Sequence, residues 1–326
     1  MTPPSVGTVS AGAALSTRVE EAIRTQVVGQ ERIVQRLLIG LLAGGHVLLE
    51  GVPGLAKTLM VRMLASALDV DFKRIQFTPD LLPSDVVGSL VFRPDRGVFV
   101  PSKGPIFANI VLADELNRAP AKVQSALLEA MQERQVTLGG RALTLPDPFM
   151  VLATENPIDQ QGTYPLAEAQ LDRFLLMLRL TYPERDDEQR ILRSVTDGHS
   201  EVVQRVATAE DLLAERALVR QTVVEDALIE YVTDLVRATR DPASVGLPEL
   251  EGLIEYGASP RAGIALISAA RALAYLKGRA YVVPDDVKEL AHDAMRHRLV
   301  LTYEATARGI DPDSVLDRIL AVVPLP

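Results

Sequence analysis

The chain of 326 residues contains no cysteine and no tryptophan, and only 4% of its residues are aromatic. Without cysteine the chain forms no disulfide, thiol nucleophile or thiolate metal site, which is typical of a cytoplasmic protein. Few aromatic side chains argue against a platform on which nucleic-acid bases stack. No apolar run approaches the roughly 18 residues of a membrane-spanning helix, and residues 1–15 lack the pattern of a signal peptide. We therefore expect a cytoplasmic protein without a membrane span.

The composition is rich in apolar residues and has an acidic balance. Hydrophobic residues make up 48% of the chain, which suffices for a sizeable core and roughly two domains. The 34 Lys and Arg residues are outnumbered by 43 Asp and Glu, giving a net charge of −9. A nucleic-acid partner is not expected, because such proteins usually show a basic surplus. Arg296 and Arg298 are candidates for a local basic patch, but a solvated helix face is the favoured interpretation.

The first two-thirds of the chain alternates helical periodicity with short apolar runs. Helices are predicted at Gln30–Leu42 and at about Thr58–Leu68. Buried strands are predicted at His46–Glu50, Lys73–Phe77, Ile110–Ala113, Phe149–Thr154 and Leu175–Leu180. Short apolar strands separated by helices favour an α/β fold with a parallel sheet covered on both faces.

Beyond about residue 181 the pattern changes to amphipathic helices, the clearest over 225–240, 260–277 and 284–298. We therefore predict a flexible leader over residues 1–15, an α/β core over residues 16–181 and an all-helical domain over residues 182–326. Gly139 and Gly140 separate two short runs, which predicts a β-hairpin over about 135–144.

A candidate phosphate-binding loop lies between a predicted strand and a predicted helix. Backbone N–H groups of such a loop cradle phosphates, and the Lys57 ammonium would contact the β- and γ-phosphates. Thr58 would offer its hydroxyl to Mg²⁺. Ala56 departs from the GxxxxGK[ST] pattern; we expect its methyl to narrow the loop slightly and to remove no donor. The residues expected to bind nucleotide here are Gly51, Val52, Pro53, Gly54, Leu55, Ala56, Lys57, Thr58 and Leu59. The alternative is an ordinary Gly/Pro turn before a helix.

Two acids follow the apolar run Ile110–Ala113. A buried strand would deliver them to the carboxyl edge of the sheet, where α/β proteins bind ligands. Asp114 would hold Mg²⁺ through water, and Glu115 would polarise the attacking water. Alone, such a pair is more often a helix N-cap, but behind a phosphate loop it is interpreted as a Walker B element.

Three further residues are candidates for contacts with phosphate. Asn156 follows another strand, so its amide could reach the γ-phosphate, although Asn-Pro is also a common turn. Arg173 and Arg261 each lie at the end of a predicted helix. Their positions suit phosphate contacts across interfaces, whereas a lone arginine at a helix end is usually structural.

Taken in order, these motifs resemble those of AAA+ ATPases, and the segments between them resemble the MoxR family. The resemblance covers about Ser16 to Pro326. The segments that carry it are Val28–Gln30, Gln76–Asp85, Gly104–Phe107, Asp114–Pro120, Leu127–Met131 and Gly162–Phe174. MoxR-like proteins often have alanine where this chain has Ala56, so that departure does not predict an inactive site.

The resemblance implies a P-loop AAA+ core with a parallel sheet between helices, followed by a helical lid. It implies ATP and Mg²⁺ as ligands, a homo-oligomeric ring that is expected to be a hexamer, and a chaperone-like role on a client. Such clients often contain a von Willebrand factor A domain. Residues 78–104 would form the helix-2 insert and the 135–144 hairpin the insertion before sensor 1, both facing the ring axis or the partner.

The resemblance also implies roles for single residues. Asn156 corresponds to sensor 1, Arg173 to the arginine finger and Arg261 to sensor 2, which acts on its own site or a neighbour's. The residues expected to flank the adenine are Val28, Gly29 and Gln30.

The leading hypothesis is a Mg²⁺-dependent ATPase that couples hydrolysis to remodelling, maturation or activation of a protein partner. One alternative is a nucleotide-gated scaffold with little turnover. The other is a motor of the same architecture, either magnesium-chelatase-like or acting on DNA.

Overall fold

The structure is a computed structural model that describes residues 6–23, 26–52, 54–95, 97–156, 163–196 and 203–326. The chain divides into two compact units. The first, here called the α/β unit, comprises residues 16–166 and 178–214. The second, here called the helical unit, comprises residues 1–15, 167–177 and 215–326. Nowhere in the described part of the chain is a helix both long and apolar enough to cross a membrane.

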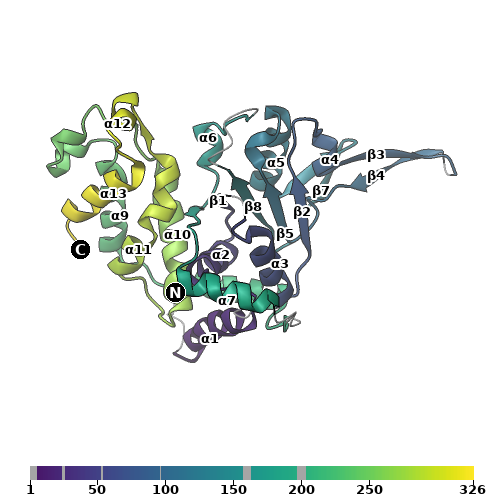
Figure 1. The fold of residues 1–326 in the computed structure, drawn as a ribbon, viewed down its shortest axis with the longest axis horizontal. Helices are drawn as coiled ribbons and strands as arrows, with labels where there is room; N and C mark the ends of the chain where they lie inside the picture. Colours follow the sequence, from purple (N-terminus) through teal and green to yellow (C-terminus); the bar gives the residue numbers. More distant parts are fainter. Residues whose placement is uncertain (1–5, 24–25, 53, 96, 157–162, 197–202) are drawn as a thin grey trace. The chain divides into compact units, whose positions relative to one another are not determined.

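A five-stranded sheet forms the centre of the α/β unit (Figure 1). Its strands are β1 (Val47–Glu50), β2 (Phe72–Gln76), β5 (Ile110–Asp114), β8 (Met150–Glu155) and β9 (Leu176–Arg179). The order is β2-β5-β8-β1-β9, and β2, β5, β8 and β1 pair in parallel. The first residues of β1, β5 and β8 are buried in succession rather than alternately, because helices cover both faces. All five predicted strands are confirmed to within about a residue at each end.

Two helices of this unit, α2 (Glu31–Ala43) and α3 (Lys57–Ala67), lie where helical periodicity predicted them, whereas α5 (Ala121–Glu133) was not predicted. The unit also contains α7 (Arg185–Thr196). The helix α1 (Val6–Ile23) begins inside the segment predicted as a flexible leader, so residues 6–15 are helical instead. Leu15, Val19 and Ile23 recur every four residues and are buried, which gives this helix an apolar stripe to pack.

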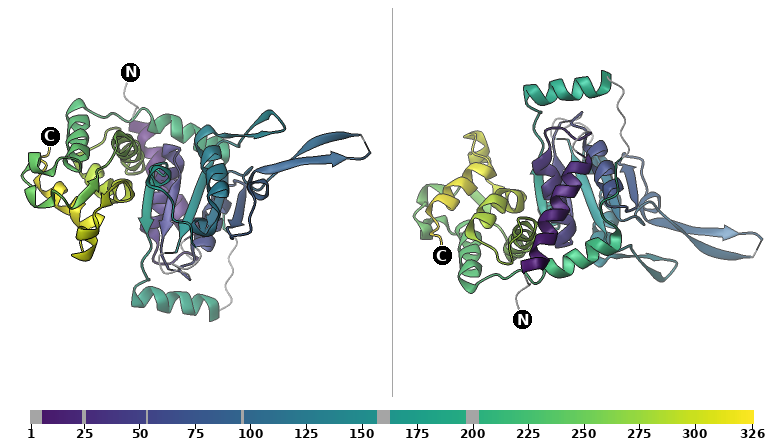
Figure 2. Two further views of the ribbon diagram at one scale, coloured as in Figure 1. Left: turned by 90° about the horizontal axis from the view of Figure 1, so that it is seen from above. Right: turned by 90° about the horizontal axis from the view of Figure 1, so that it is seen from below.

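Two hairpins extend from the α/β unit (Figure 2). The segment 78–104, predicted as the helix-2 insert, contains the short helix α4 (Pro83–Val87) and the antiparallel strands β3 (Gly88–Arg93) and β4 (Val98–Lys103). The second hairpin, β6 (Gln135–Leu138) and β7 (Arg141–Thr144), is confirmed where it was predicted. Gly139 and Gly140 have φ values of 58° and 77°, which the two-residue turn requires and glycine adopts without strain.

The helical unit packs its helices around an alanine-rich core. Its elements are α6 (Glu168–Leu171), α9 (Asp226–Ala238), η2 (Pro242–Val245), η3 (Pro248–Leu250), α10 (Pro260–Leu276), α11 (Pro284–Met295), η4 (Arg296–Arg298), α12 (Tyr303–Ala307) and α13 (Pro312–Val322), while α8 (Ala209–Val219) lies where the two units divide. One face of α10 is almost entirely alanine and leucine, so neighbouring helices approach it closely. A small antiparallel pair, β10 (Ile254–Tyr256) and β11 (Val300–Leu301), departs from the all-helical expectation.

The observed division of the chain differs from the predicted boundary at residue 181 in two segments. Residues 167–177 group with the helical unit, and residues 178–214, including α7, group with the α/β unit. Within the α/β unit, α7 approaches Gly29 so closely that an added Cβ there would clash with the carboxylate of Asp187. Gly29 has a φ of 73°, so glycine is favoured there on both counts.

Candidate active site

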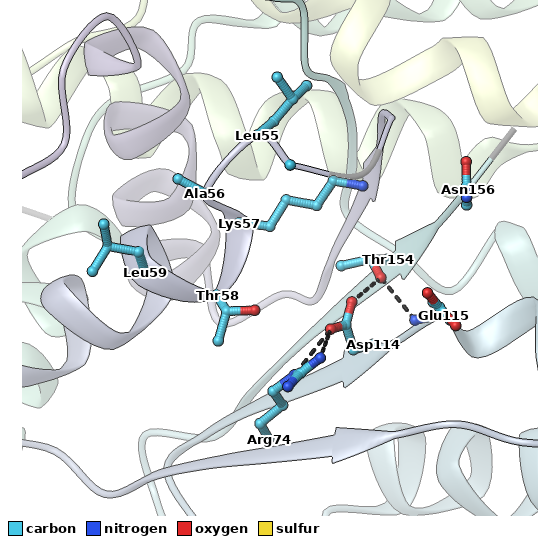
Figure 3. A pocket seen from close by; sticks show the side chains of 11 residues that line it. Leu55, Ala56, Lys57, Thr58, Leu59, Arg74, Asp114, Glu115, Thr154 and Asn156 are labelled. Atoms are coloured by element: carbon cyan, nitrogen blue, oxygen red, sulfur yellow. Dashed lines mark hydrogen bonds and ion pairs between the residues drawn. The ribbon is translucent and has the colours of Figure 1, made fainter. Parts of the chain in front are cut away.

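A cavity of about 490 Å³ opens at the carboxyl ends of the strands of the α/β unit (Figure 3). It is lined by Gly54, Leu55, Ala56, Lys57, Thr58, Leu59, Arg74, Asp114, Glu115, Thr154 and Asn156. The structure thus brings together the predicted phosphate loop, both predicted acids and Asn156. Gly51 and Val52 belong to the same loop but do not line the cavity, and Pro53 lies outside the described residues.

The loop connects β1 to α3, and its last residue has an unusual backbone. Ala56 has a φ of 52° and a ψ of 25°, which is the left-handed region. An L-residue there is destabilised by roughly 1–2 kcal/mol, which explains why the general pattern has glycine at this position. The departure at Ala56 therefore acts on the backbone conformation, whereas a narrowing of the loop by the methyl was expected.

Lys57 is the first residue of α3, and its side chain is partly buried in the cavity. Its ammonium donates a hydrogen bond to the carbonyl oxygen of Gly51, at the start of the same loop. Burial lowers the pKa of Lys57, and the carboxylates of Asp114, Glu115 and Glu50 oppose that shift. The Lys57 ammonium therefore interacts with three carboxylates, and bound phosphate groups would add further negative charge beside it.

Asp114, the last residue of β5, is held by two partners that the sequence analysis missed. Its Oδ2 accepts hydrogen bonds from Arg74, at 2.9 Å from Nε and 2.7 Å from Nη2. Its Oδ1 accepts one of 2.7 Å from the hydroxyl of Thr154. Arg74 lies on β2, and β2 adjoins β5 although the two strands are far apart in sequence. A polar side chain in an otherwise buried strand was the available signal for Thr154.

Glu115 follows β5 in a strained conformation. Its φ of 59° and ψ of 49° are left-handed, a state that non-glycine residues adopt mainly at functional sites. Its N–H donates a hydrogen bond of 2.8 Å to the Thr154 hydroxyl, and Oε2 accepts one of 3.0 Å from Nη1 of Arg118. Thr154 thus bridges the two acids, and the hydroxyl of Thr58 is directed toward Asp114 (Figure 3).

The donor set of this cavity fits a magnesium ion. A carboxylate offers about four lone-pair sites, and Arg74 and Thr154 occupy three of those on Asp114. One site on Oδ1 is left, and the Thr58 hydroxyl lines the same cavity. Within the described residues there is no group of three or more His, Cys, Asp or Glu that could hold a metal. Mg²⁺ usually binds through few protein oxygens together with water and phosphate, and the Asp114 carboxylate and the Thr58 hydroxyl offer oxygens of this kind.

A second cavity, of about 510 Å³, shares Gly54, Leu55 and Ala56 with the first. The rest of its lining is Val28, Gln30, Tyr182, Pro183, Glu188, Ile191 and Leu192. Val28 and Gln30, two of the three residues predicted to flank the adenine, line this cavity, whereas Gly29 approaches α7. The contribution of Tyr182 and of α7 was not predicted, because the sequence of a charged helix does not indicate which unit it packs against. The apolar lining suits a flat, weakly polar ring.

Arg173 and Arg261 belong to the helical unit and are exposed. Neither is among the residues that line the two cavities. Arg296 and Arg298 are only 7% and 8% exposed, so both the basic patch and the solvated helix face are wrong for them. Their side chains bind backbone carbonyls and carboxylates instead.

Comparison with known proteins gives consistent matches. The family "ATPase family associated with various cellular activities (AAA)" matches residues 46–176, and the family "AAA lid domain" matches residues 250–319. The chain is 49% identical to Chaperone MoxR1 of Mycobacterium tuberculosis, over 93% of this chain and 80% of that protein. It is 46% identical to the uncharacterized protein YeaC of Bacillus subtilis, over 94% and 93% of the two chains. The crystal structure of a "putative ATPase" from Cytophaga hutchinsonii superposes with a TM-score of 0.93 at 47% identity, covering 98% of this chain and 97% of that one.

Proposed function

Because this chain belongs to the MoxR family of AAA+ ATPases, we propose that its two cavities, which share three lining residues, bind ATP and that the chain hydrolyses it to ADP and phosphate. The observation that carries the proposal is the single cavity shared by Lys57, Asp114 and Glu115. A cation that meets phosphates, a carboxylate for a metal and a second carboxylate for water are the parts that phosphoryl transfer to water needs.

Binding divides between the two cavities. The apolar second cavity takes the adenine, with Val28, Tyr182 and Ile191 among its walls. The shared residues Gly54, Leu55 and Ala56 then lead the phosphates toward the first cavity. There Lys57 exchanges its hydrogen bond with the Gly51 carbonyl for charge-assisted contacts with the β- and γ-phosphates.

Mg²⁺ would be held by the hydroxyl of Thr58 and, through water, by Asp114. When bound, it neutralises charge on the phosphate oxygens. Arg74 and Thr154 fix the Asp114 carboxylate, so its remaining lone pair faces one direction.

Hydrolysis requires a base for water and a donor beside the γ-phosphate. Glu115 accepts the proton of the attacking water. Thr154 fixes its backbone and Arg118 binds its Oε2, so the carboxylate is held in position for this step. Asn156, on the same cavity wall at the end of β8, orients the water or the γ-phosphate through its amide. Charge that develops on the transferred group is stabilised by Arg173 and Arg261, one or both supplied by a neighbouring subunit of a homo-oligomeric ring, which we take to be a hexamer.

The purpose of hydrolysis on this proposal is chaperone-like remodelling, maturation or activation of a client protein complex. The name of the relative Chaperone MoxR1 supports this role. The partner class that we propose to test first is a protein with a von Willebrand factor A domain. We propose that the two proteins meet in the cytoplasm. Capture with Glu115→Gln, which we expect to hold ATP without hydrolysing it, tests for such a client.

The test of the function is ATP hydrolysis by the purified, assembled protein. Glu115→Gln is expected to bind ATP and lose hydrolysis, because the amide keeps the shape but accepts no proton. Lys57→Ala is expected to weaken ATP binding by about 1.5–3 kcal/mol or more, measured by calorimetry. The exposed residues Glu129 and Lys122 on α5 provide the controls Glu129→Gln and Lys122→Ala, which should behave as wild type. Nucleotide binding without turnover in every assembly state would indicate a nucleotide-gated scaffold instead.

A further inference from the structure

Asp172 lies in the turn between α6 and β9, within the helical unit, and both of its carboxylate oxygens are bound. Oδ1 accepts a hydrogen bond of 2.7 Å from Nε of Arg298, and Oδ2 accepts one of 3.2 Å from the hydroxyl of Ser259. Nη1 of Arg261 lies 3.8 Å from the same Oδ2. One carboxylate thus contacts three side chains that come from two separate parts of the helical unit.

Arg298 fixes this carboxylate in place. Its side chain is 3% exposed, and Nη2 donates hydrogen bonds of 3.1 Å to the carbonyl of Asp172 and 2.7 Å to that of Phe174. Burial lowers the pKa of Arg298, and the negative charge of Asp172 opposes this lowering. Because Arg298 is buried and the Asp172 side chain is only 19% exposed, removing the carboxylate would leave the guanidinium charge uncompensated.

The rest of η4 holds the remainder of the turn. Nε2 of His297 donates a hydrogen bond of 3.1 Å to the carbonyl of Phe174, and Nη1 of Arg296 donates one of 2.5 Å to that of Met177. The backbone on both sides of Arg173 is therefore tied to η4. The Arg173 side chain is exposed, and among the residues that the structure describes it forms no ion pair.

The Ser259 hydroxyl connects Asp172 to Arg261. Ser259 is the N-cap of α10, and its Oγ accepts the N–H of Arg261 at 3.2 Å while donating to Asp172. The side chain of Arg261 is 56% exposed, and its guanidinium forms an ion pair with Asp172. The two candidate arginines are thus linked through one carboxylate, directly in the case of Arg261 and along the backbone in the case of Arg173.

We propose that Asp172 is a positioning residue for ATP hydrolysis: held by Arg298, its carboxylate sets the orientation of Arg261 and of the turn that presents Arg173. The inference rests on the proposed function, because it assigns a role toward the same reaction. It adds that the two arginines act as one group that is carried by the helical unit, so that a change at one alters the other.

The test compares Asp172→Asn with a matched control in the same unit. Asp286→Asn removes a buried carboxylate, which accepts 2.7 Å and 2.5 Å hydrogen bonds from Arg279 and contacts neither candidate arginine. Both variants should lower the melting temperature. Only Asp172→Asn should lower kcat, by between about tenfold and a hundredfold, as misplacement of a group that acts on the transition state does. The Kd for ATP should stay at the wild-type value. Equal kcat values for the two variants, measured where both are folded and assembled, would overturn the proposal.

A double-mutant cycle separates positioning from a purely structural role. If Asp172 acts partly through Arg261, the loss of kcat in Asp172→Asn combined with Arg261→Ala is smaller than the product of the two single losses. Losses that multiply fully would overturn the link to Arg261.

A milder variant covers the case in which Asp172→Asn does not assemble. Ser259→Ala removes the hydroxyl bridge and one helix cap, and Thr302→Ala removes the cap of α12 as its control. A lower kcat for Ser259→Ala alone supports the proposal, and equal kcat values contradict it. Absence of ATPase activity in the wild type would instead reject the proposed function, before any of these variants is measured.

Discussion

Glu50 and Glu155 are opposite each other in register at the carboxyl ends of β1 and β8, one residue before the phosphate loop and one before Asn156. Burial, and to a lesser degree the charge of Glu50, raise the pKa of Glu155 to about 7. Arg179 donates a hydrogen bond of 2.9 Å to Glu50, so this cation compensates the negative charge of Glu50. Glu155 is instead stabilised in its protonated form. A carboxyl group that titrates near neutral pH thus lies next to the candidate site.

This pair makes stability depend on pH. The folded protein binds the Glu155 proton more tightly than the unfolded chain does, because in the unfolded chain this carboxyl has its ordinary pKa of 4.5. The stabilisation is therefore complete below about pH 4.5 and is lost as the pH rises through about 7. The loss is about 3 kcal/mol, because one pKa unit corresponds to about 1.4 kcal/mol. Urea unfolding between about pH 5 and pH 8 should show this decline in the wild type and a smaller one in Glu155→Gln. Parallel curves for the two proteins would contradict the assignment.

The left-handed backbone at Ala56 predicts a stabilising substitution. Ala56→Gly relieves roughly 1–2 kcal/mol of strain and loses about 0.4–1 kcal/mol through the freer unfolded chain, for a net gain of up to about 1.6 kcal/mol. The control is Ala214→Gly, at an exposed position inside α8, which should destabilise by about 1 kcal/mol. The free energy of unfolding is the measurement, and ATP affinity should not change. A loss of stability in Ala56→Gly would mean that the methyl packs in the loop.

The ion pair between Arg74 and Asp114 predicts an effect on the metal requirement. Arg74→Gln removes a cation from Oδ2 of Asp114, so it should lower the Mg²⁺ concentration that gives half-maximal ATPase activity. Arg62→Gln, at an exposed position on α3, is the control and should leave this concentration unchanged. A higher requirement in Arg74→Gln would show that Arg74 mainly orients Asp114.

The exposed Arg173 predicts complementation between subunits. Arg173→Ala should keep ATP binding and lose turnover, since arginine fingers supplied in trans contribute about 10³–10⁵ in rate in other phosphoryl-transfer systems. Mixing Arg173→Ala with Lys57→Ala subunits should restore part of the activity, because some interfaces then combine an intact site with an intact arginine. Arg308→Ala, which breaks an exposed pair with Glu304, is the control and should retain turnover. No recovery in mixtures that co-assemble would place Arg173 outside the neighbour's site.

The features that the sequence determines by itself are local ones. Asp114 ends a buried strand, and the phosphate loop, Glu115 and Asn156 each follow one directly. Parallel strands bring their carboxyl ends to one edge of a sheet. Position along the chain was enough to predict that these residues share a site. The two-glycine turn of the β6–β7 hairpin is local in the same sense, because its backbone demands glycine whatever surrounds it.

Only the tertiary structure decided the contacts between segments that are distant in sequence. Arg74 reaches Asp114 because β2 adjoins β5, an order that periodicity does not encode. α7 is charged along most of its length, yet it supplies Ile191 and Leu192 to the apolar cavity because Gly29 allows it to approach. Arg298 is polar by type and was expected in solvent. It is buried because Asp172 and the carbonyls of the following turn satisfy its charge and its donors, partners that lie more than a hundred residues away in the chain.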